Sequence, residues 1–330
     1  MRIAIDAHGG DKAPAAAVEG TLRAAKELPD AELILVGKPE EVEPMIRAAG
    51  KPSNVTLAAA EEVIEADDEP AKAVRRKKQS SMVIAGRMVR EGQADALVSA
   101  GNTGALMATG LLVVGRIEGI ERPALAPILP TMDGVGMLAL DLGANMDSTP
   151  EHLVQYAIMG SLYRSRVHGM EKPRVGLLNV GTEPMKGNEL TKAAFEQLER
   201  APVNFIGNVE SRDVLFRNCD VLVCDGFAGN IMLKSMEGTA TAVFKALKEQ
   251  FTSSLWTKLA AAVLAPGIRR FRSKMDYATY GGAPMLGVNG VCVKAHGSSD
   301  AQAFANGIKQ AYQEVRHQLV QTIASEFSRK

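Results

Sequence analysis

The stretch Arg2-Ile3-Ala4-Ile5-Asp6-Ala7-His8-Gly9-Gly10-Asp11 carries the first signature of the fold, because an apolar run with β-branched residues ends in a polar, glycine-rich turn. A helical pattern follows from Ala15 to Glu27. This order of strand, turn and helix is typical of a βαβ unit with parallel strands. Its recurrence along the chain predicts an α/β protein in three layers, with a large, mostly parallel sheet between two layers of helices.

The other elements are predicted by the same signals. Strands are expected at Leu33–Gly37, Val55–Ala58, Ala94–Ser99, Val175–Val180, Val203–Gly207, Val221–Cys224 and Val291–Lys294. Helices are expected at Pro39–Ala49, Met82–Glu91, Glu151–Arg164 and Glu189–Glu199.

One region departs from this alternation. The apolar runs Ala124–Thr131 and Val135–Leu142 flank Met132-Asp133-Gly134, which predicts a hairpin and therefore an antiparallel pair of strands. The sequence has no repeat and no Ser/Gly-rich linker. We therefore expect a single domain over residues 1–330, built on one large sheet, with a helical excursion at about 235–280.

Composition excludes several classes of protein. The 330 residues are 46% apolar and carry 38 basic and 38 acidic side chains, which argues against a disordered chain and a general nucleic-acid binder. The three cysteines form no C-x-x-C pair, so no disulfide framework or zinc site is indicated. The start of the chain lacks a secretory apolar segment, and the longest apolar run, Ala105–Gly115, is shorter than the ~20 residues that cross a bilayer. We expect a cytoplasmic protein.

Four polar loops follow predicted strands: Asp6–Asp11, Ser99–Gly104, Gly181–Asn188 and Asp225–Asn230. Ligands of open α/β sheets bind beyond the carboxyl ends of the strands, and free N–H groups at helix starts favour anions. Each loop alone is compatible with an ordinary turn, but together they predict a phosphate-handling site. Its candidate binding residues are Gly9, Gly10, Gly101, Asn102, Thr103, Gly104 and His296.

Two further residues are candidates for chemistry. Lys186 lies on a glycine-bounded loop, where its alternative is an ordinary solvated lysine, and Asn230 lies near a helix start, where its alternative is helix capping. Cys224 is a possible nucleophile but has no histidine near it in the sequence, so a buried structural role is the alternative that we favour. No P-loop occurs, the Gly134–Ala139 match to a dinucleotide fingerprint precedes a strand, and neither a metal nor a cofactor is expected.

Two basic clusters could bind an acidic partner or a lipid surface, or could be solvated helix faces. The first contains Arg75, Arg76, Lys77 and Lys78, and the second contains Arg269, Arg270 and Arg272. From Ala240 onward the chain carries 12 basic and 5 acidic residues, so the second cluster lies in a region of net positive charge.

An apolar stripe precedes the second cluster. Phe244, Leu247, Phe251, Leu255, Leu259 and Val263 recur at helical spacing. The expected membrane-facing residues are Leu255, Trp256, Leu259, Val263 and Leu264. A pair of helices in a dimer is the alternative, and both can coexist. Pro266-Gly267 predicts a helix break between the apolar and the basic parts.

Six segments together resemble the phosphate acyltransferase (PlsX) family of bacterial phospholipid synthesis. They are I-D-A-x-G-G-D at Ile5–Asp11, A-V-R-x-K-K-x-S-S-M at Ala73–Met82, S-A-G-N-T-G-A at Ser99–Ala105, L-D-x-G-A-N at Leu140–Asn145, N-V-G-x-E-x-x-K-G at Asn179–Gly187 and D-G-F-x-G-N at Asp225–Asn230. His8 departs from the family, which usually has methionine there, and is expected to face the site.

The resemblance implies a function. Members of this family transfer a fatty acyl group reversibly from acyl carrier protein to inorganic phosphate, and their product feeds a membrane glycerol-3-phosphate acyltransferase. They are homodimeric, cytoplasmic and peripherally attached to the membrane, with a fold similar to that of isocitrate and isopropylmalate dehydrogenases. The family's catalytic lysine and asparagine fall on Lys186 and Asn230. Direct attack by phosphate on the thioester would need no protein nucleophile.

Other functions remain open from the residues alone. An acyltransferase that uses coenzyme A thioesters would do the same chemistry with another donor. A decarboxylating dehydrogenase would need a nucleotide site and a carboxylate cluster for a metal, and neither is apparent. A non-catalytic membrane adaptor for acyl carrier protein would explain the basic and apolar excursion but not the four glycine-containing loops.

Overall fold

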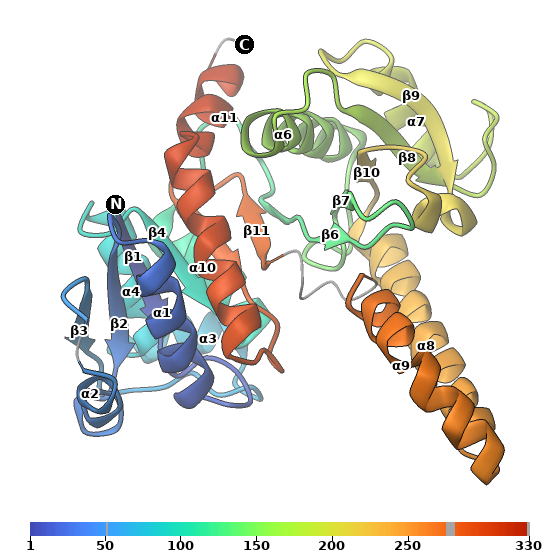
Figure 1. Cartoon of the computed structure of the whole chain (residues 1–330). Helices are drawn as coiled ribbons and strands as arrows, with labels where there is room; N and C mark the ends of the chain where they lie inside the picture. Colours follow the sequence, from blue (N-terminus) through green and yellow to red (C-terminus); the bar gives the residue numbers. More distant parts are fainter. Residues whose placement is uncertain (51, 275–280, 329–330) are drawn as a thin grey trace.

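The computed structural model describes residues 1–50, 52–274 and 281–328, and the strands within them form two sheets. Seven strands lie in the order β3-β2-β1-β4-β12-β11-β5, and five lie in the order β6-β7-β10-β8-β9. Figure 1 shows the two sheets side by side, with a pair of long helices projecting away from them.

The seven-stranded sheet is parallel from β3 to β12 and antiparallel at β11 and β5. Its strands are β1 (Arg2–Asp6), β2 (Glu32–Gly37), β3 (Val55–Ala59), β4 (Ala96–Ser99), β5 (Ala124–Leu125), β11 (Ala283–Leu286) and β12 (Val291–Lys294). The five-stranded sheet is parallel except for β6. Its strands are β6 (Ile128–Leu129), β7 (Met137–Leu140), β8 (Arg174–Asn179), β9 (Asn204–Glu210) and β10 (Val221–Val223).

Helices cover both faces of the seven-stranded sheet, because its buried residues alternate between two apolar clusters. Ile3 and Ile5 pack on one side and Ala4 on the other. One layer contains α1 (Ala15–Glu27), α2 (Pro39–Ala48) and α10 (Ala301–Arg316). The other contains α3 (Pro70–Arg76), α4 (Ser81–Arg90), α5 (Thr103–Thr109) and the π-helical turn Gly110–Val114.

The five-stranded sheet is covered in the same way. One face packs on α6 (Pro150–His168), α7 (Glu189–Leu198) and α11 (Leu319–Phe327). The other packs on the 3₁₀ turn Ser211–Phe216 and the first turns of α8 (Gly226–Phe251). The expected three-layer, mostly parallel α/β class with an antiparallel pair is confirmed, and every predicted strand and helix listed from periodicity is present within a few residues of its expected bounds.

The single continuous sheet was a wrong prediction, and Pro127 supplies a physical reason. The apolar run Ala124–Thr131 is interrupted there, since proline has no N–H to donate to a strand partner. On one side, Ala126 N–H donates to Pro284 O in the seven-stranded sheet. On the other, Ala139 N–H donates to Pro127 O in the five-stranded sheet. The predicted hairpin survives as the antiparallel pair β6–β7.

The excursion is a helical hairpin made of α8 and α9 (Leu255–Lys274), which projects from the five-stranded sheet (Figure 1). The predicted break at Pro266-Gly267 is wrong, because α9 continues through Pro266 and the turn lies between the two helices. A proline removes one helical N–H, and the carbonyl that loses its partner can be hydrated on an exposed helix. The single predicted stripe is therefore divided between two helices, whose Phe244 and Phe271 rings lie 6.2 Å apart.

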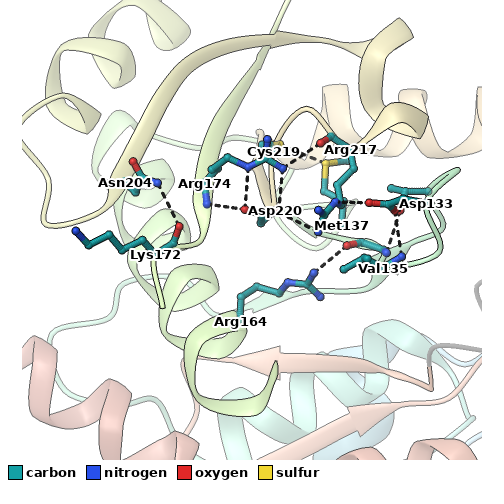
Figure 2. Close-up of polar contacts among 12 residues, drawn as sticks. Asp133, Val135, Met137, Arg164, Lys172, Arg174, Asn204, Arg217, Cys219 and Asp220 are labelled. Atoms are coloured by element: carbon teal, nitrogen blue, oxygen red, sulfur yellow. Dashed lines mark hydrogen bonds and ion pairs between the residues drawn. The ribbon is translucent and has the colours of Figure 1, made fainter. Parts of the chain in front are cut away.

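Figure 2 shows the amino-terminal edge of the five-stranded sheet, which is closed by ion pairs. Asp220 accepts from Arg174 at 3.1 Å and lies 3.3 Å from Arg217, which also pairs with Asp133 at 2.7 Å. The Asp220 carboxyl pKa is lowered by the two arginines and by a backbone N–H, against an opposing effect of burial. Buried Arg164 donates to Gly136 O at 2.9 Å. This edge joins strands and helices, so the open loops lie at the opposite edge.

Candidate active site

Each sheet presents three loops at the carboxyl ends of three adjacent strands. In the seven-stranded sheet they follow β1, β4 and β12, and in the five-stranded sheet they follow β7, β10 and β8. All four loops that the sequence singled out belong to these two sets, two in each sheet. The candidate residues therefore come from both sheets, and the two sets of loops differ in construction.

The loops of the seven-stranded sheet approach one another as backbone. A Cβ added at Gly9 would lie 2.5 Å from the Gly101 nitrogen, closer than real contacts allow. Gly10 has φ +98°, and a Cβ there would lie 2.9 Å from Gly297 O. Asp11 N–H donates to Gly297 O at 2.8 Å. These glycines are needed for the close packing of three loops, which form what we call the glycine cradle: residues 9–11, 99–104 and 295–298.

Buried Asp6 holds the cradle from beneath. Its carboxylate accepts from the hydroxyls of Ser81 and Ser99, each at 2.6 Å, and from the His8 N–H at 3.2 Å. The Ser99 hydroxyl in turn accepts from the Gly101 N–H at 3.0 Å. Charge-assisted bonds of this kind are the stronger hydrogen bonds in proteins, so Asp6 ties the ends of β1 and β4 together.

Asn102 has a mainly structural side chain. Its Oδ1 accepts from Ala105 N–H at 3.0 Å and caps α5, and its Nδ2 donates to Ala66 O at 3.0 Å and Asp68 O at 3.2 Å. Asn102 is therefore left with its backbone N–H for a ligand, as is Gly104, whereas the Gly101 N–H already donates to the Ser99 hydroxyl. The adjoining Thr103 is exposed at the first turn of α5.

His8 turns out of the cradle, so the expectation that it faces the site is wrong. Its Nε2 accepts from Lys38 N–H at 3.0 Å, at the junction between β2 and α2. The ring also contacts Gly37, where a Cβ would lie 3.0 Å from Nε2. The departure from the family at this position affects the neighbouring loop and not the cradle.

The third part of the cradle contains His296 and directly follows buried Lys294. Lys294 Nζ donates to Ala100 O at 3.3 Å and to Ala295 O. Burial lowers its pKa to about 8, although the carboxylates of Asp6 and Asp11 raise it. Burial and the charge of Lys294 also lower the pKa of His296, whose Nδ1 lies 2.8 Å from the Ser298 hydroxyl.

In the five-stranded sheet, Asp141 organises the loop that supports Asn230. Buried Asp141 accepts three backbone N–H groups, from Gly143, Ala144 and Asn145, at 2.6–3.2 Å. Burial raises its pKa, while these donors lower it. Asn145 O then accepts from Gly226 N–H at 3.0 Å, which fastens this loop to the start of α8.

Asn230 lies in the first turns of α8 and is half-exposed. It is not the helix cap, because Asp225 accepts from the N–H groups of Phe227 and Ala228 at 3.0 and 2.9 Å. The Asn230 amide instead faces Gly143, where a Cβ would lie 3.3 Å from Oδ1. Within the described residues the Asn230 amide has no hydrogen-bond partner, so it can donate to a substrate.

Lys186 is exposed on a loop that is fastened on both sides. Asn179, the last residue of β8, donates from Nδ2 to Lys186 O at 3.1 Å. Asn208, on β9, donates from Nδ2 to Glu183 O at 2.8 Å. Gly187 has φ +100°, and a Cβ there would collide with the Thr191 hydroxyl at 2.1 Å. The backbone of the loop is thereby positioned while the lysine side chain remains in solvent.

Cys224 is unsuited to nucleophilic catalysis. The side chain is 2% exposed, and its Sγ donates to Asp141 O at 3.2 Å. Burial and the charges of Asp141 and Asp225 raise the pKa of the thiol. Since the thiolate is the nucleophile, this environment favours the structural interpretation.

Electrostatic effects connect the two sets of loops. Lys234 and Glu237 on α8, one and two turns beyond Asn230, both act on the pKa of His296, Lys234 lowering it and Glu237 raising it. Charges on the first part of α8 therefore act on the third part of the glycine cradle. The structure thus brings the cradle residues together on one sheet and Lys186 and Asn230 onto neighbouring loops of the other.

The predicted docking residues have different environments. Lys77 is paired with Asp68 and also donates to Val63 O at 2.9 Å, whereas Arg75, Arg76 and Lys78 are exposed. Arg269, Arg270 and Arg272 lie on α9, but their side chains fall outside the described residues, as does that of Leu255. Trp256, Leu259, Val263 and Leu264 are exposed on the same helix, Trp256 to 82%.

Among the residues that the structure describes, no group of three or more potential metal ligands occurs, and no helix is long and apolar enough to span a bilayer.

Sequence reasoning did not assign the residues that position the site. Asp6, Asp141 and Asn179 lie within the quoted motifs, and their places at strand ends were a signal that could have found them. Lys294 is the charged last residue of an otherwise apolar strand, which was a weaker signal. Asn208 had no signal, because its partner lies on another strand's loop.

Comparison with known proteins shows the family. A family model described as "Fatty acid synthesis protein" matches residues 1–322. A curated protein from Bacillus cereus (strain B4264), named "Phosphate acyltransferase", is 55% identical over 325 residues, which cover 98% of this chain and 98% of that protein. A protein of the same name from Bacillus thuringiensis (strain Al Hakam) has the same identity and coverage. This chain belongs to the phosphate acyltransferase (PlsX) family.

The family is one of acyltransferase enzymes, and solved structures show how widely its fold is shared. A phosphotransacetylase from Streptococcus pyogenes superposes on 96% of this PlsX-family chain and 94% of its own, with a TM-score of 0.61 and 16% identity. A protein described as a 4-hydroxythreonine-4-phosphate dehydrogenase from Salmonella typhimurium covers 94% and 98%, with a TM-score of 0.51 and 15% identity. At these identities the likeness concerns the fold alone, and it agrees with the expected dehydrogenase-like architecture.

Proposed function

We propose that this chain transfers a fatty acyl group reversibly from acyl carrier protein to inorganic phosphate and so forms acyl phosphate. The observation that carries the proposal is the pairing of two loop sets, a backbone cradle suited to an anion and a loop that presents an exposed lysine. The curated relatives named phosphate acyltransferase support phosphate as the acceptor. Acyl carrier protein as the donor rests on the motifs.

The proposed step is a direct displacement. A phosphate oxygen attacks the thioester carbonyl carbon, and negative charge develops on the former carbonyl oxygen. The C–S bond then breaks, the acyl group stays on phosphate, and the carrier-protein thiolate leaves and takes up a proton from solvent. Because phosphate is already nucleophilic and a thioester is already activated, the protein needs only to align the reactants and stabilise charge.

Each part of the site has a role in this scheme. The cradle binds phosphate through backbone N–H groups at the starts of loops and of α5. Lys186 offsets the phosphate charge and holds it against the carbonyl. Asn230 donates to the developing oxyanion. Burial of Cys224 disfavours a covalent acyl-enzyme.

The deciding experiment follows palmitoyl-acyl carrier protein with and without phosphate, measuring free carrier-protein thiol and trapping acyl phosphate as the hydroxamate with hydroxylamine. We expect thiol release that requires phosphate and yields the hydroxamate. Release without phosphate would indicate a thioesterase, and binding of the carrier protein without release would indicate an adaptor. Palmitoyl-coenzyme A in a parallel reaction tests the donor, and we expect slower turnover with it.

The exposed arginines Arg75 and Arg76, with Lys78, are the proposed docking site for acidic acyl carrier protein. Exposed charges are screened over about 10 Å at 0.1 M salt, so carrier-protein affinity should fall as salt rises. Lys77 is expected to matter least, because Asp68 already neutralises it. Binding that is insensitive to salt would contradict electrostatic docking.

We further propose that the hairpin attaches a cytoplasmic homodimer to the membrane, where a glycerol-3-phosphate acyltransferase would consume the product in phospholipid synthesis. Trp256, Leu259 and Val263 expose apolar side chains with Lys258 among them. Each such apolar side chain contributes about 1.5–3 kcal/mol if fully inserted. Each basic residue near an anionic leaflet adds about 1 kcal/mol.

Vesicles of phosphatidylcholine and phosphatidylglycerol test this attachment by co-sedimentation. Trp256→Ser with Val263→Ser should abolish most binding, whereas Phe216→Ser, a control on the body with 67% exposure, should leave it unchanged. Analytical ultracentrifugation tests the dimer. A monomeric double variant with unchanged vesicle binding would show that the apolar face joins two copies instead.

A further inference from the structure

Lys294 is a buried lysine at the base of the glycine cradle. It is the last residue of β12 and lies opposite Ser99 in the parallel register with β4. The residue is only 9% exposed. Its ammonium donates to Ala100 O and Ala295 O, the carbonyls that directly follow β4 and β12. The side chain therefore joins the loops after β4 and β12 from below.

The charge of this lysine is not neutralised by contact. In the described part of the chain Lys294 makes no ion pair, and its two partners are carbonyl oxygens. Burial lowers the pKa of Lys294 to about 8, and it outweighs the carboxylates of Asp6 and Asp11, which raise this pKa only through space. Asp6 accepts from two serine hydroxyls and a backbone N–H, as described above.

A merely structural bridge would not need a cation. Burying an ammonium without a contacting anion costs free energy, whereas a neutral amide could donate to the same two carbonyls at a lower cost. Lysine also has three donors, and two carbonyls account for two of them. An anion bound in the cradle would pair with this buried charge, which Asp6 and Asp11 offset only through space.

We propose that Lys294 is a positioning residue of the phosphate subsite, which joins two cradle loops through their carbonyls and places a buried positive charge behind the bound phosphate. This inference rests on the proposed function for the identity of the anion. Lys294 and Lys186 then have different tasks, since Lys294 shapes and charges the subsite and Lys186 contacts the reacting phosphate.

The test compares Lys294→Gln, which keeps two donors without charge, with Lys294→Arg, which keeps the charge. Lys309→Gln is the matched control, because Lys309 lies on α10 of the same half and pairs with Glu27 on the surface. Two readouts are needed: the rise in Tm on addition of inorganic phosphate, which requires no turnover, and the KM values for phosphate and acyl donor.

For Lys294→Gln we expect the phosphate-induced rise in Tm to vanish and the KM for phosphate to rise at least tenfold, with the donor KM within twofold of wild type. Lys294→Arg should recover most of the phosphate KM, and Lys309→Gln should behave as wild type. An unchanged phosphate KM and Tm rise in a folded Lys294→Gln overturns the proposal. If Lys294→Gln does not fold, Lys294→Met is compared with Lys294→Arg. A folded Lys294→Met with the wild-type phosphate KM and Tm rise would overturn the proposal equally.

The proposed function and the proposed role of Lys294 can be contradicted separately. A wild-type protein that is stabilised by phosphate but releases no thiol contradicts the transferase and leaves the Lys294 comparison intact. A wild-type protein that transfers acyl groups to phosphate while the Lys294 variants keep the wild-type phosphate KM contradicts the role of Lys294 alone.

Discussion

The loops at the carboxyl edges of the two sheets are held in place in different ways. At the seven-stranded sheet, buried polar groups hold the backbone in place: Asp6 and Ser99 join one pair of strand ends, and Lys294 joins another. At the five-stranded sheet, Asn179 and Asn208 fasten a loop whose lysine points into solvent. The difference teaches that the first edge fixes backbone groups and the second exposes a lysine side chain. Under the proposed function these are a binding edge and a presenting edge, so damage to each should have different consequences.

The largest expected effect is on the presenting edge. Lys186→Ala should lower the phosphate-dependent transfer rate by about 10³, which corresponds to about 4 kcal/mol of lost charge stabilisation. Because the side chain is exposed, the Tm should stay within about 1 °C of wild type. Lys192→Ala, an exposed lysine on α7, is the control and should keep full activity. Near-normal turnover of Lys186→Ala would remove the lysine from the mechanism.

Asn230→Ala is expected to lower the rate by about 10², or about 2.7 kcal/mol, because one donor to the oxyanion is lost. The loss should appear in kcat more than in the KM for phosphate, since the contact strengthens as charge develops. Steady-state kinetics against Ser235→Ala, an exposed residue on the same helix, measure the effect. A change confined to KM would indicate a ground-state contact instead.

A variant of the binding edge should show the opposite pattern. Asp6→Asn keeps the size of the side chain but weakens two hydroxyl bonds and one N–H bond, and should lower the free energy of unfolding by about 2 kcal/mol. Urea denaturation measures this cost. Phosphate KM should rise as the cradle loosens, whereas kcat at saturating phosphate should change little. A stable variant with reduced kcat would reverse the division between the two edges.

The smallest effect concerns the junction between the two halves. Fully buried Glu314 on α10 accepts from Gln310, which also donates to Tyr163 on α6. Burial raises the pKa of Glu314 to about 8. Between about pH 4.5 and 8 the unfolded chain loses this proton and the folded chain keeps it, so Glu314 makes folding less favourable as pH rises.

Glu314→Gln removes that dependence. Its free energy of unfolding relative to wild type should therefore grow by about 1 kcal/mol per pH unit between pH 5 and 7. Urea denaturation at pH 5, 6 and 7 measures the trend, with Glu196→Gln, exposed on α7, as the control. A constant difference across the three pH values would show that Glu314 is ionised in the folded protein.

Much of the fold followed from local signals. The helix at Ala15–Glu27 has the predicted bounds, and the hairpin around Asp133 joins β6 and β7. The functional loops were found because glycine and polar residues after an apolar strand form a recognisable local pattern. The motif resemblance then implied roles for Lys186 and Asn230. In the structure Lys186 is exposed, and the Asn230 amide has no hydrogen-bond partner among the described residues.

The three wrong structural predictions have a common cause. The sequence predicted one sheet, a helix break at Pro266 and a site-facing His8, and each depends on what surrounds the residue in space. Pro127 divides a run between two sheets only because partner strands exist on both sides. His8 leaves the cradle because Lys38 N–H, 30 residues away, offers it a hydrogen bond.

By itself, the sequence determined the element types, the positions of the glycine-containing loops and the family, since periodicity, turn residues and motifs are properties of short segments. Only the tertiary structure decided which loops meet and which polar groups hold them. Ser99 reaches Asp6 across 93 residues, and Lys294 reaches Ala100 across 194. Such contacts depend on the order and register of parallel strands, which arise when distant segments pack together and cannot be encoded in any one of them.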